Sequence, residues 1–345
     1  MHKRIVTILA MAAAGWGAEI PRTSDGKPDL SGTYDIATLT PLTRTASLGE
    51  RQSLTDDEAK ALAAQAKAVA AATNKASDPN RKAPPTGGDG SEGPAGNVGG
   101  YNSLWVDVGE GAFKVDGKWR TSILIDPPNG RMPAVTAEAR RLGALRAKMS
   151  RPNQGDAFWI TEGISPGPYD DPEMRPTAER CLLSFGSGGG PPMLPVMYNN
   201  LKQLVLTKDT LVILNEMVHD ARVVRINGEH EPPELRRWLG DSIGRWEGDT
   251  LVVDTTNFND NPAIGATRNL HVVERFKRID AKSLLYGFTV EDPTVWTKPW
   301  SGEILWPVTE QRIFEYACHE GNYSFSGILK GARLLEAEAE KKVKK

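Results

Sequence analysis

The sequence predicts a mainly β protein, in which an antiparallel meander closes into a lipocalin-like barrel or forms a curved sheet, with helices near the N-terminus. Short segments with strand-like alternation dominate the chain from Lys202 onward, and tight turns separate several of them. Short connections join antiparallel neighbours, because parallel strands need a long crossover. Since open sheet edges invite aggregation, the meander is expected to close as a barrel or to lie against the N-terminal helices.

Each expected element has a local signal. Thr55 and Glu58 form a capping box before an Ala-rich helix that ends near Thr73, and Thr136 caps a second helix that ends near Met149. Asn227-Gly228 is one of the expected tight turns of the meander. Strands are expected at 101–108, 120–126, 203–207, 211–218, 222–226, 244–247, 250–256, 270–279, 284–290 and 312–319.

The chain divides into four parts. Residues 1–18 are expected to be a signal peptide, because a positive start precedes a short apolar run and small residues. That run is shorter than the ~20 apolar residues of a membrane span. Residues 19–100 contain the first helix and a flexible Gly/Pro-rich loop, residues 101–333 a single β-rich domain, and residues 334–345 a charged tail. We therefore expect a periplasmic or secreted protein without a membrane span.

The composition and net charge of the chain indicate which classes of binding partner to expect. The chain has 39% hydrophobic and 25% charged residues and a formal net charge of -2, which is ordinary for a globular protein. The near-neutral balance argues against a nucleic-acid partner, because neutralising phosphates needs a basic face. The expected partner is a small-molecule or oligosaccharide substrate, and the sequence does not indicate an oligomeric state.

The two cysteines, Cys181 and Cys318, are expected to form a disulfide, because an exported protein folds in an oxidising compartment. The alternative is a reactive thiol at Cys318 beside His319.

Three histidines lie next to or near carboxylates in strand-like stretches, in His219-Asp220, in His271 with Glu274, and in His319-Glu320. Imidazole beside carboxylate is common in proton transfer and in metal binding. A zinc site at His219, His271 and His319 is an alternative, but no pair has metal-ligand spacing. We expect no cofactor.

Strand parity separates these groups, because neighbouring residues of a strand face opposite sides. Glu274 shares the apolar face of its strand, whereas His271 lies with charged residues. Asp292 and Glu320 fall on apolar faces when their strands are continued. These three carboxylates are therefore the expected pocket acids. The alternative is that each pairs with a structural arginine, for which Arg222, Arg275, Arg312 and Arg333 are available.

The nine tryptophans suggest a surface for planar or sugar ligands. Trp296 and Trp300, close to Asp292, are the candidates for substrate binding, with Arg222 and His271. The alternative is that both indoles are core anchors.

Several motifs occur together between Gly99 and Arg333 and resemble those of a family of uncharacterised exported bacterial proteins. They include the stretches 179–181 (ERC), 216–220 (EMVHD), 246–258 (WEGDTLVVDTTNF), 271–276 (HVVERF) and 316–323 (YACHEGNY). The resemblance implies export and one continuous domain, and it brings no activity.

Together these observations predict an exported hydrolase or lyase that acts by acid–base chemistry on a small or oligomeric polar substrate such as a glycan or glycoside. The lack of a dinucleotide-binding signature favours this chemistry over redox chemistry. The alternative is a non-catalytic, lipocalin-like protein that binds a small ligand. The expected catalytic residues are Glu274, Asp292, Glu320, His219, Asp220 and His319.

Overall fold

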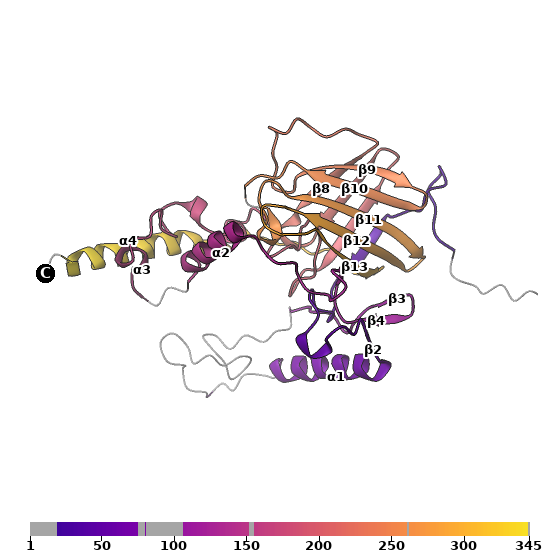
Figure 1. Ribbon diagram of the computed structural model, residues 1–345, viewed down its shortest axis with the longest axis horizontal. Coiled ribbons are helices and arrows are strands. Elements are labelled where there is room, and N and C mark those ends of the chain that lie inside the picture. The colour runs from indigo at the N-terminus through magenta and orange to yellow at the C-terminus, as the bar shows by residue number, and fades with distance from the viewer. Residues whose placement is uncertain (1–18, 75–79, 81–105, 152–154, 261, 344–345) are drawn as a thin grey trace, which may run out of the picture.

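A ten-stranded curled sheet forms the centre of the computed structural model, which describes residues 19–74, 80, 106–151, 155–260 and 262–343 (Figure 1). The expected mainly β fold is confirmed. In sheet order the strands are β1 (Gly32–Asp35), β6 (Leu201–Leu206), β7 (Thr210–Asn215), β8 (Ala221–Ile226), β9 (Asp241–Glu247), β10 (Thr250–Thr256), β11 (His271–Asp280), β12 (Ser283–Glu291), β13 (Trp300–Pro307) and β5 (Leu124–Asp126).

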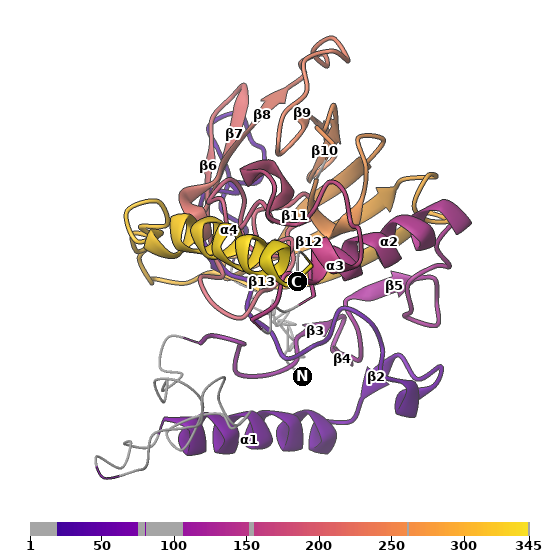
Figure 2. The ribbon, with the colours of Figure 1, turned by 90° about the vertical axis from the view of Figure 1, so that its left-hand side faces the viewer.

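The sheet curls far enough for β1 and β13 to touch (Figure 2). An isolated bridge joins Tyr34 to Val308, and the Thr309 amide donates to the Thr33 carbonyl at 2.9 Å. The strand β5 then pairs with β13, so the ladder continues past this contact instead of closing on β1. The architecture is therefore a curved half-barrel, and the lipocalin-like closed barrel is not confirmed.

Alternation along the strands fills the inside of the curl with apolar side chains. Tyr286 of β12 stacks on Trp306 of β13 with ring centroids 4.5 Å apart, and Phe276 of β11 packs against both. All three are fully buried. Burying a large apolar side chain contributes roughly 1.5–3 kcal/mol, so these aromatic rings stabilise the curl.

One pairing differs from the expected antiparallel meander. The strands β8 and β9 are parallel, with Val224 opposite Ser242. The Asn227-Gly228 turn does not form a tight hairpin, because the chain continues through the long connection 227–240 before β9 begins. A connection of this length can return the chain to the same end of the sheet, which parallel pairing requires.

Other expected strands also change. The expected strand 211–218 ends at Asn215, and the chain turns through Met217–His219. Residues 312–319 form no strand, and 120–126 is divided between two sheets. The strand β13 was not expected, although it alternates regularly, with Trp300, Ile304 and Trp306 buried. Three predictions fall largely or wholly outside the described residues. They are the expected strand 101–108, the expected Gly/Pro-rich loop that ends at residue 100, and the expected signal peptide.

A small sheet lies beside the curl, in the order β2 (Ser53–Leu54), β4 (Lys118–Arg120) and β3 (Lys114–Val115). The helix α1 (Asp56–Thr73) follows β2 (Figure 1). Its expected capping box is confirmed, because Thr55 Oγ1 accepts from the Glu58 amide at 3.2 Å and the Thr55 amide donates to Glu58 at 2.8 Å.

We expect Thr55→Ala to destabilise α1 by about 1 kcal/mol, because it leaves a first-turn amide without its acceptor. Hydrogen exchange of the α1 amides should accelerate accordingly. The control is Gln65→Ala at an exposed site in the middle of the helix, which should leave exchange almost unchanged. Equal exchange in Thr55→Ala and the parent protein would contradict the capping role.

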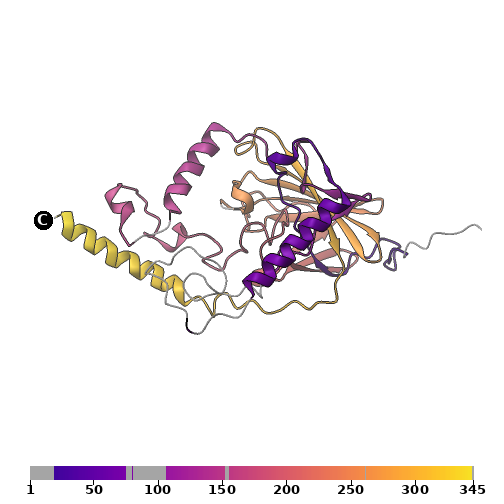
Figure 3. The ribbon, with the colours of Figure 1, turned by 90° about the horizontal axis from the view of Figure 1, so that it is seen from below.

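Three helices form an arm that projects from one side of the sheet (Figure 3). They are α2 (Ala137–Met149), α3 (Phe158–Thr161) and α4 (Tyr323–Val343), and the last includes most of the expected charged tail. Trp159 is buried against Ala332 and Ala339. The expected disulfide between Cys181 and Cys318 is present, and it ties the segment before α4 to the segment after α3. Short 3-10 turns lie at Ala46–Leu48, Pro172–Met174, Met217–His219 and Ala263–Gly265.

No helix within the described part of the chain has both the length and the apolar character needed to span a membrane.

Candidate functional site

Glu274 lies on the inside of the curled sheet, as strand parity predicts, and its side chain is completely buried. It forms a two-point ion pair with Arg222 from β8, with Nη2 of Arg222 2.8 Å from Oε1. The Tyr286 hydroxyl donates to the same oxygen at 2.8 Å, and the Met193 amide donates to that hydroxyl at 2.9 Å. Glu274 is therefore a neutralised core acid, which is the arginine-paired alternative of the sequence analysis.

Among the described residues, no hydrogen bond joins Asp292 or Glu320 to Glu274. Asp292 is buried in a turn after β12, where it accepts hydrogen bonds from Thr267 and Thr294. Glu320 is exposed in a turn before α4. The parity argument holds for the burial of Asp292, because Asp292 is buried while Glu291 is half-exposed. It fails for Glu320, because residues 312–319 form no strand.

The histidines expected near these acids are separated as well. His219 Nε2 lies 3.0 Å from the Phe314 carbonyl oxygen and 3.1 Å from the Tyr316 amide, so it links residues 314–316 to the turn Met217–His219. His319 is exposed. Asp220 is half-buried and accepts from the Ser184 amide at 3.3 Å.

The two tryptophans expected to bind substrate belong to the core. Trp300 is fully buried, Trp296 is 5% exposed, and their ring centroids lie 5.5 Å apart in an edge-to-face arrangement. Both pack in the main hydrophobic cluster inside the curl. The surroundings of Trp296 and Trp300 therefore match the alternative interpretation, in which both indoles anchor the core.

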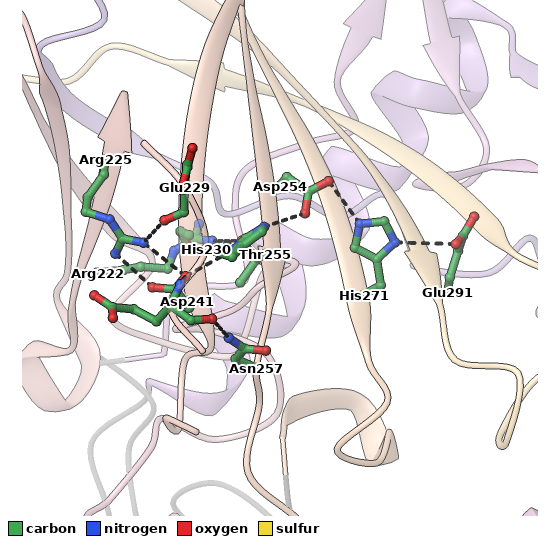
Figure 4. Close-up of polar contacts among 12 residues, drawn as sticks. Arg222, Arg225, Glu229, His230, Asp241, Asp254, Thr255, Asn257, His271 and Glu291 are labelled. Atoms are coloured by element: carbon green, nitrogen blue, oxygen red, sulfur yellow. Dashed lines mark hydrogen bonds and ion pairs between the residues drawn. The ribbon is translucent and has the colours of Figure 1, made fainter. Parts of the chain in front are cut away.

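A different cluster forms on the outer face of the sheet, where carboxylates and imidazoles alternate (Figure 4). His230 Nδ1 lies 2.9 Å from Oδ2 of Asp241, and its Nε2 lies 3.0 Å from Oδ1 of Asp254. The other oxygen of Asp254 lies 3.0 Å from Nε2 of His271, whose Nδ1 lies 3.4 Å from Glu291. We call these five residues the histidine–carboxylate relay.

The sheet sets the spacing of the relay. Strand parity puts Asp254 of β10 and His271 of β11 on the outer face, opposite the inward Thr255 and Val272. In the register of β11 and β12, His271 lies directly across from Glu291. Adjacent strands lie about 4.8 Å apart, which brings these side chains within hydrogen-bonding reach.

His230 reaches the relay from the connection between β8 and β9. Arg225 donates to the Glu229 carbonyl oxygen at 2.7 Å, and the Glu231 amide donates to Asp241 at 3.0 Å. Asn257 donates to the Glu231 carbonyl oxygen at 2.8 Å. These backbone contacts on both sides of His230 hold its ring between the two aspartates (Figure 4).

Each imidazole of the relay has carboxylate oxygens next to both of its ring nitrogens. Both ring nitrogens of His230 face carboxylate oxygens, and so do both ring nitrogens of His271. An ionised carboxylate only accepts hydrogen bonds, so both nitrogens must donate for all contacts to be made. For His271 this arrangement fits the imidazolium form, which puts a positive group between Asp254 and Glu291.

The pKa shifts follow this pattern. The hydrogen bond to Asp254 raises the pKa of His271 above its ordinary value, with a smaller contribution from Glu291, while burial acts against both. The hydrogen bond from His271 lowers the pKa of Asp254. Burial alone would raise the pKa of Asp241, but hydrogen bonds from Arg225, His230 and the Glu231 amide together lower it.

A groove of about 360 Å³ lies on the same outer face and ends beside the relay. Its lining includes Arg275 and Lys277 of β11 and Thr289 of β12. Val273 lies between the groove and the relay, because it pairs with Asp254 on one side and Thr289 on the other. Neither Arg275 nor Lys277 forms an ion pair with a described residue, and the lining carboxylate, Glu303, is paired with Arg120. The groove is therefore positively charged beside the imidazoles.

Four residues of the relay were not predicted from the sequence: His230, Asp241, Asp254 and Glu291. The local signal for His230 is its position between Glu229 and Glu231, but nothing in that stretch indicates a contact with β9 or β10. Among the residues whose placement is described, no group of three or more His, Cys, Asp or Glu side chains has the geometry of a metal site.

Comparisons with protein-family models, with curated proteins and with solved structures give no match for this chain.

Proposed function

We propose that this protein is an exported acid–base enzyme, a hydrolase or lyase, whose proton-transfer site is the histidine–carboxylate relay. The observation that carries the proposal is Asp254, whose two oxygens hold two imidazoles that are only partly covered by protein. The side chains of His230, Asp254 and His271 are 27%, 25% and 34% exposed, so the relay meets solvent. Imidazole held by a carboxylate is the commonest acid–base device of enzymes.

His271 is the proposed general acid. Its Nε2–H stays on Asp254 at 3.0 Å, whereas its Nδ1–H makes the longer, 3.4 Å contact with the half-exposed Glu291. The Nδ1 proton is therefore the one that a substrate oxygen can take. Transfer leaves a neutral imidazole that still donates to Asp254, and this imidazole can accept a proton from water or from the substrate in the next step.

The neighbouring groove supports a polar substrate with negative charge. Arg275 and Lys277 supply two cations, and Thr289 supplies a hydroxyl group beside the relay. Guanidinium and ammonium groups bind carboxylate or phosphate oxygens by charge-assisted hydrogen bonds. We therefore propose an acidic small molecule or acidic oligosaccharide as the substrate class, in place of a neutral glycan.

Export is part of the proposal. The Cys181–Cys318 disulfide supports it, because stable disulfides form mainly in oxidising compartments.

The packing inside the curled sheet does not support the alternative of a lipocalin-like protein that binds a small ligand there. Met193 and Phe276 pack close to Arg222 and Tyr286, in contact with the groups that neutralise Glu274.

The protonation state of His271 tests this proposal without a known substrate. In an NMR titration of the histidine ring signals, His271 is expected to titrate above its ordinary pKa of 6.5, because Asp254 and Glu291 stabilise the imidazolium. Asp254→Asn removes the main charge and should lower the midpoint. The signal is assigned from its absence in His271→Gln.

The exposed His319 is the internal control, since it lies outside the relay and its ring signals should be the same in both proteins. An Asp254→Asn protein in which His271 titrates at the parental pH would contradict the assigned contact and, with it, the role of His271.

A further inference from the structure

A buried lysine lies at the end of the sheet interior, away from the outer-face relay. Lys202 of β6 points to the inside of the curl with Leu204, and its side chain is fully buried. Its Nζ has no hydrogen-bond partner among the described residues. A buried ammonium without partners is costly, so native structures rarely leave one without a water, an ion or a ligand.

An unpaired acceptor lies directly opposite. Lys202 pairs with Asn215 in the register of β6 and β7, and Oδ1 of Asn215 is also buried without a hydrogen-bond partner in the described structure. The amide nitrogen of Asn215 is engaged, because it donates to the Asp220 carbonyl oxygen at 3.1 Å. The site therefore offers one free donor group and one free acceptor from neighbouring strands.

Three carboxylates surround this pair without an ion-pair contact to it. Asp220, Glu216 and Asp35 all act electrostatically on Lys202, yet no described carboxylate oxygen lies within ion-pairing distance of its Nζ. Glu216 instead accepts from the Phe314 and Leu201 amides. Three negative charges against one positive charge disfavour an anionic ligand, so the group that completes the site is neutral.

Glycines separate the cluster from a cavity of about 480 Å³. A Cβ on Gly189 would lie 2.9 Å from Oδ2 of Asp220, so only glycine fits against this carboxylate without displacing it. A Cβ on Gly188 would contact Ser184 on one side and Val196, which lines the cavity, on the other. The two glycines thus lie between Val196, which lines the cavity, and Asp220 of the cluster.

We propose that this cluster is a second site, in which the Lys202 amine binds a small neutral α-hydroxy aldehyde or ketone as a Schiff base. The carbonyl group meets Nζ, and the adjacent hydroxyl donates to Oδ1 of Asn215. Asp220 is the proposed proton donor and acceptor. This site is separate from the proposed relay and does not depend on it.

The reaction balances with these groups alone. The lone pair of the neutral amine attacks the carbonyl carbon and Asp220 protonates the oxygen, after which the Asp220 carboxylate takes a proton from the nitrogen to give a neutral carbinolamine. Loss of water then forms the C=N bond, and hydrolysis reverses each step. Burial lowers the pKa of Lys202 to about 8 and raises that of Asp220 to about 6, so both groups exchange protons near neutrality.

Reductive trapping tests the proposal. The folded protein is incubated with glycolaldehyde or dihydroxyacetone and cyanoborohydride at pH 7.4, and the modified lysines are mapped by peptide mass spectrometry. We expect Lys202 to be labelled at least about tenfold faster than the exposed Lys298, because burial increases its free-amine fraction. Lys202→Arg should remove this label alone.

Asp220→Asn keeps the amine and should slow trapping at Lys202 without changing the labelling of Lys298. Labelling confined to surface lysines, or labelling of Lys202 only after denaturation, would overturn the proposal and leave the cluster as a site for ordered water. Because the mapping uses the parent protein, the result does not depend on whether a variant folds.

Discussion

Glu274→Gln is expected to lower the free energy of unfolding by about 3–5 kcal/mol. The substitution removes the charge that neutralises Arg222, whose guanidinium is itself buried in the core. The positive charge then has no described carboxylate within ion-pairing distance, because Glu274 is its only ion-pair partner in the described structure. Urea unfolding followed by tryptophan fluorescence measures the change.

Two control variants test whether the loss of stability comes from the unpaired charge of Arg222 and not from altered packing. Asp249→Asn breaks the exposed ion pair with Arg22 and should change the stability far less than Glu274→Gln does, since solvent screens surface pairs. Adding Arg222→Met to Glu274→Gln removes the stranded charge and should restore part of the lost stability. A Glu274→Gln protein as stable as the parent would contradict a neutralised pair in the core.

His271→Gln is expected to reduce kcat/KM by roughly 10²- to 10⁴-fold, which is the usual contribution of a general acid or base. The measurement starts from an activity of the parent protein, found with a panel of chromogenic esters, glycosides and acidic oligosaccharides. Glutamine keeps hydrogen-bonding groups near Asp254 but cannot deliver a proton at neutral pH. The loss should therefore fall on the chemical step, with less effect on folding.

His319→Gln is the matched control, because it removes an exposed imidazole outside the relay and should leave the rate unchanged. Far-ultraviolet circular dichroism checks that both variants fold. If His271→Gln keeps the parental rate on every substrate of the panel, the relay is not the catalytic site.

The β-rich fold follows from short-range patterns that the sequence displays openly. Alternation identified β10 with its observed bounds, and parity put Glu274 inside the sheet and His271 outside it. The N-cap residues Thr55 and Thr136 correctly predicted where α1 and α2 begin. These features depend on neighbouring residues alone, so one sequence is sufficient to predict them.

The features that the sequence did not predict depend on long-range contacts. Nothing near His230 shows that its connection folds back across Asp241 and Asp254. The parallel pairing of β8 with β9 likewise depends on the path of residues 227–240. Glu320 was misplaced because residues 312–319 alternate without forming a strand.

The tryptophans illustrate a different ambiguity. A tryptophan close to a carboxylate in the sequence can belong to a sugar-binding surface or to the hydrophobic core. For Trp300 the strand β13 distinguishes the two. Its alternation puts Trp300 inside the curl, against Phe288 of β12. The register of the finished sheet thus decides which aromatic side chains can meet a ligand.

The pH dependence of catalysis in Asp254→Asn tests the relay most directly. If His271 acts as a general acid, activity falls as the pH rises through its pKa, which Asp254 holds above the ordinary value. Removing that charge lowers the pKa, so the falling limb of the kcat/KM profile should move to lower pH in Asp254→Asn. A limb at the same pH in both proteins would show that Asp254 does not control the proton used in catalysis.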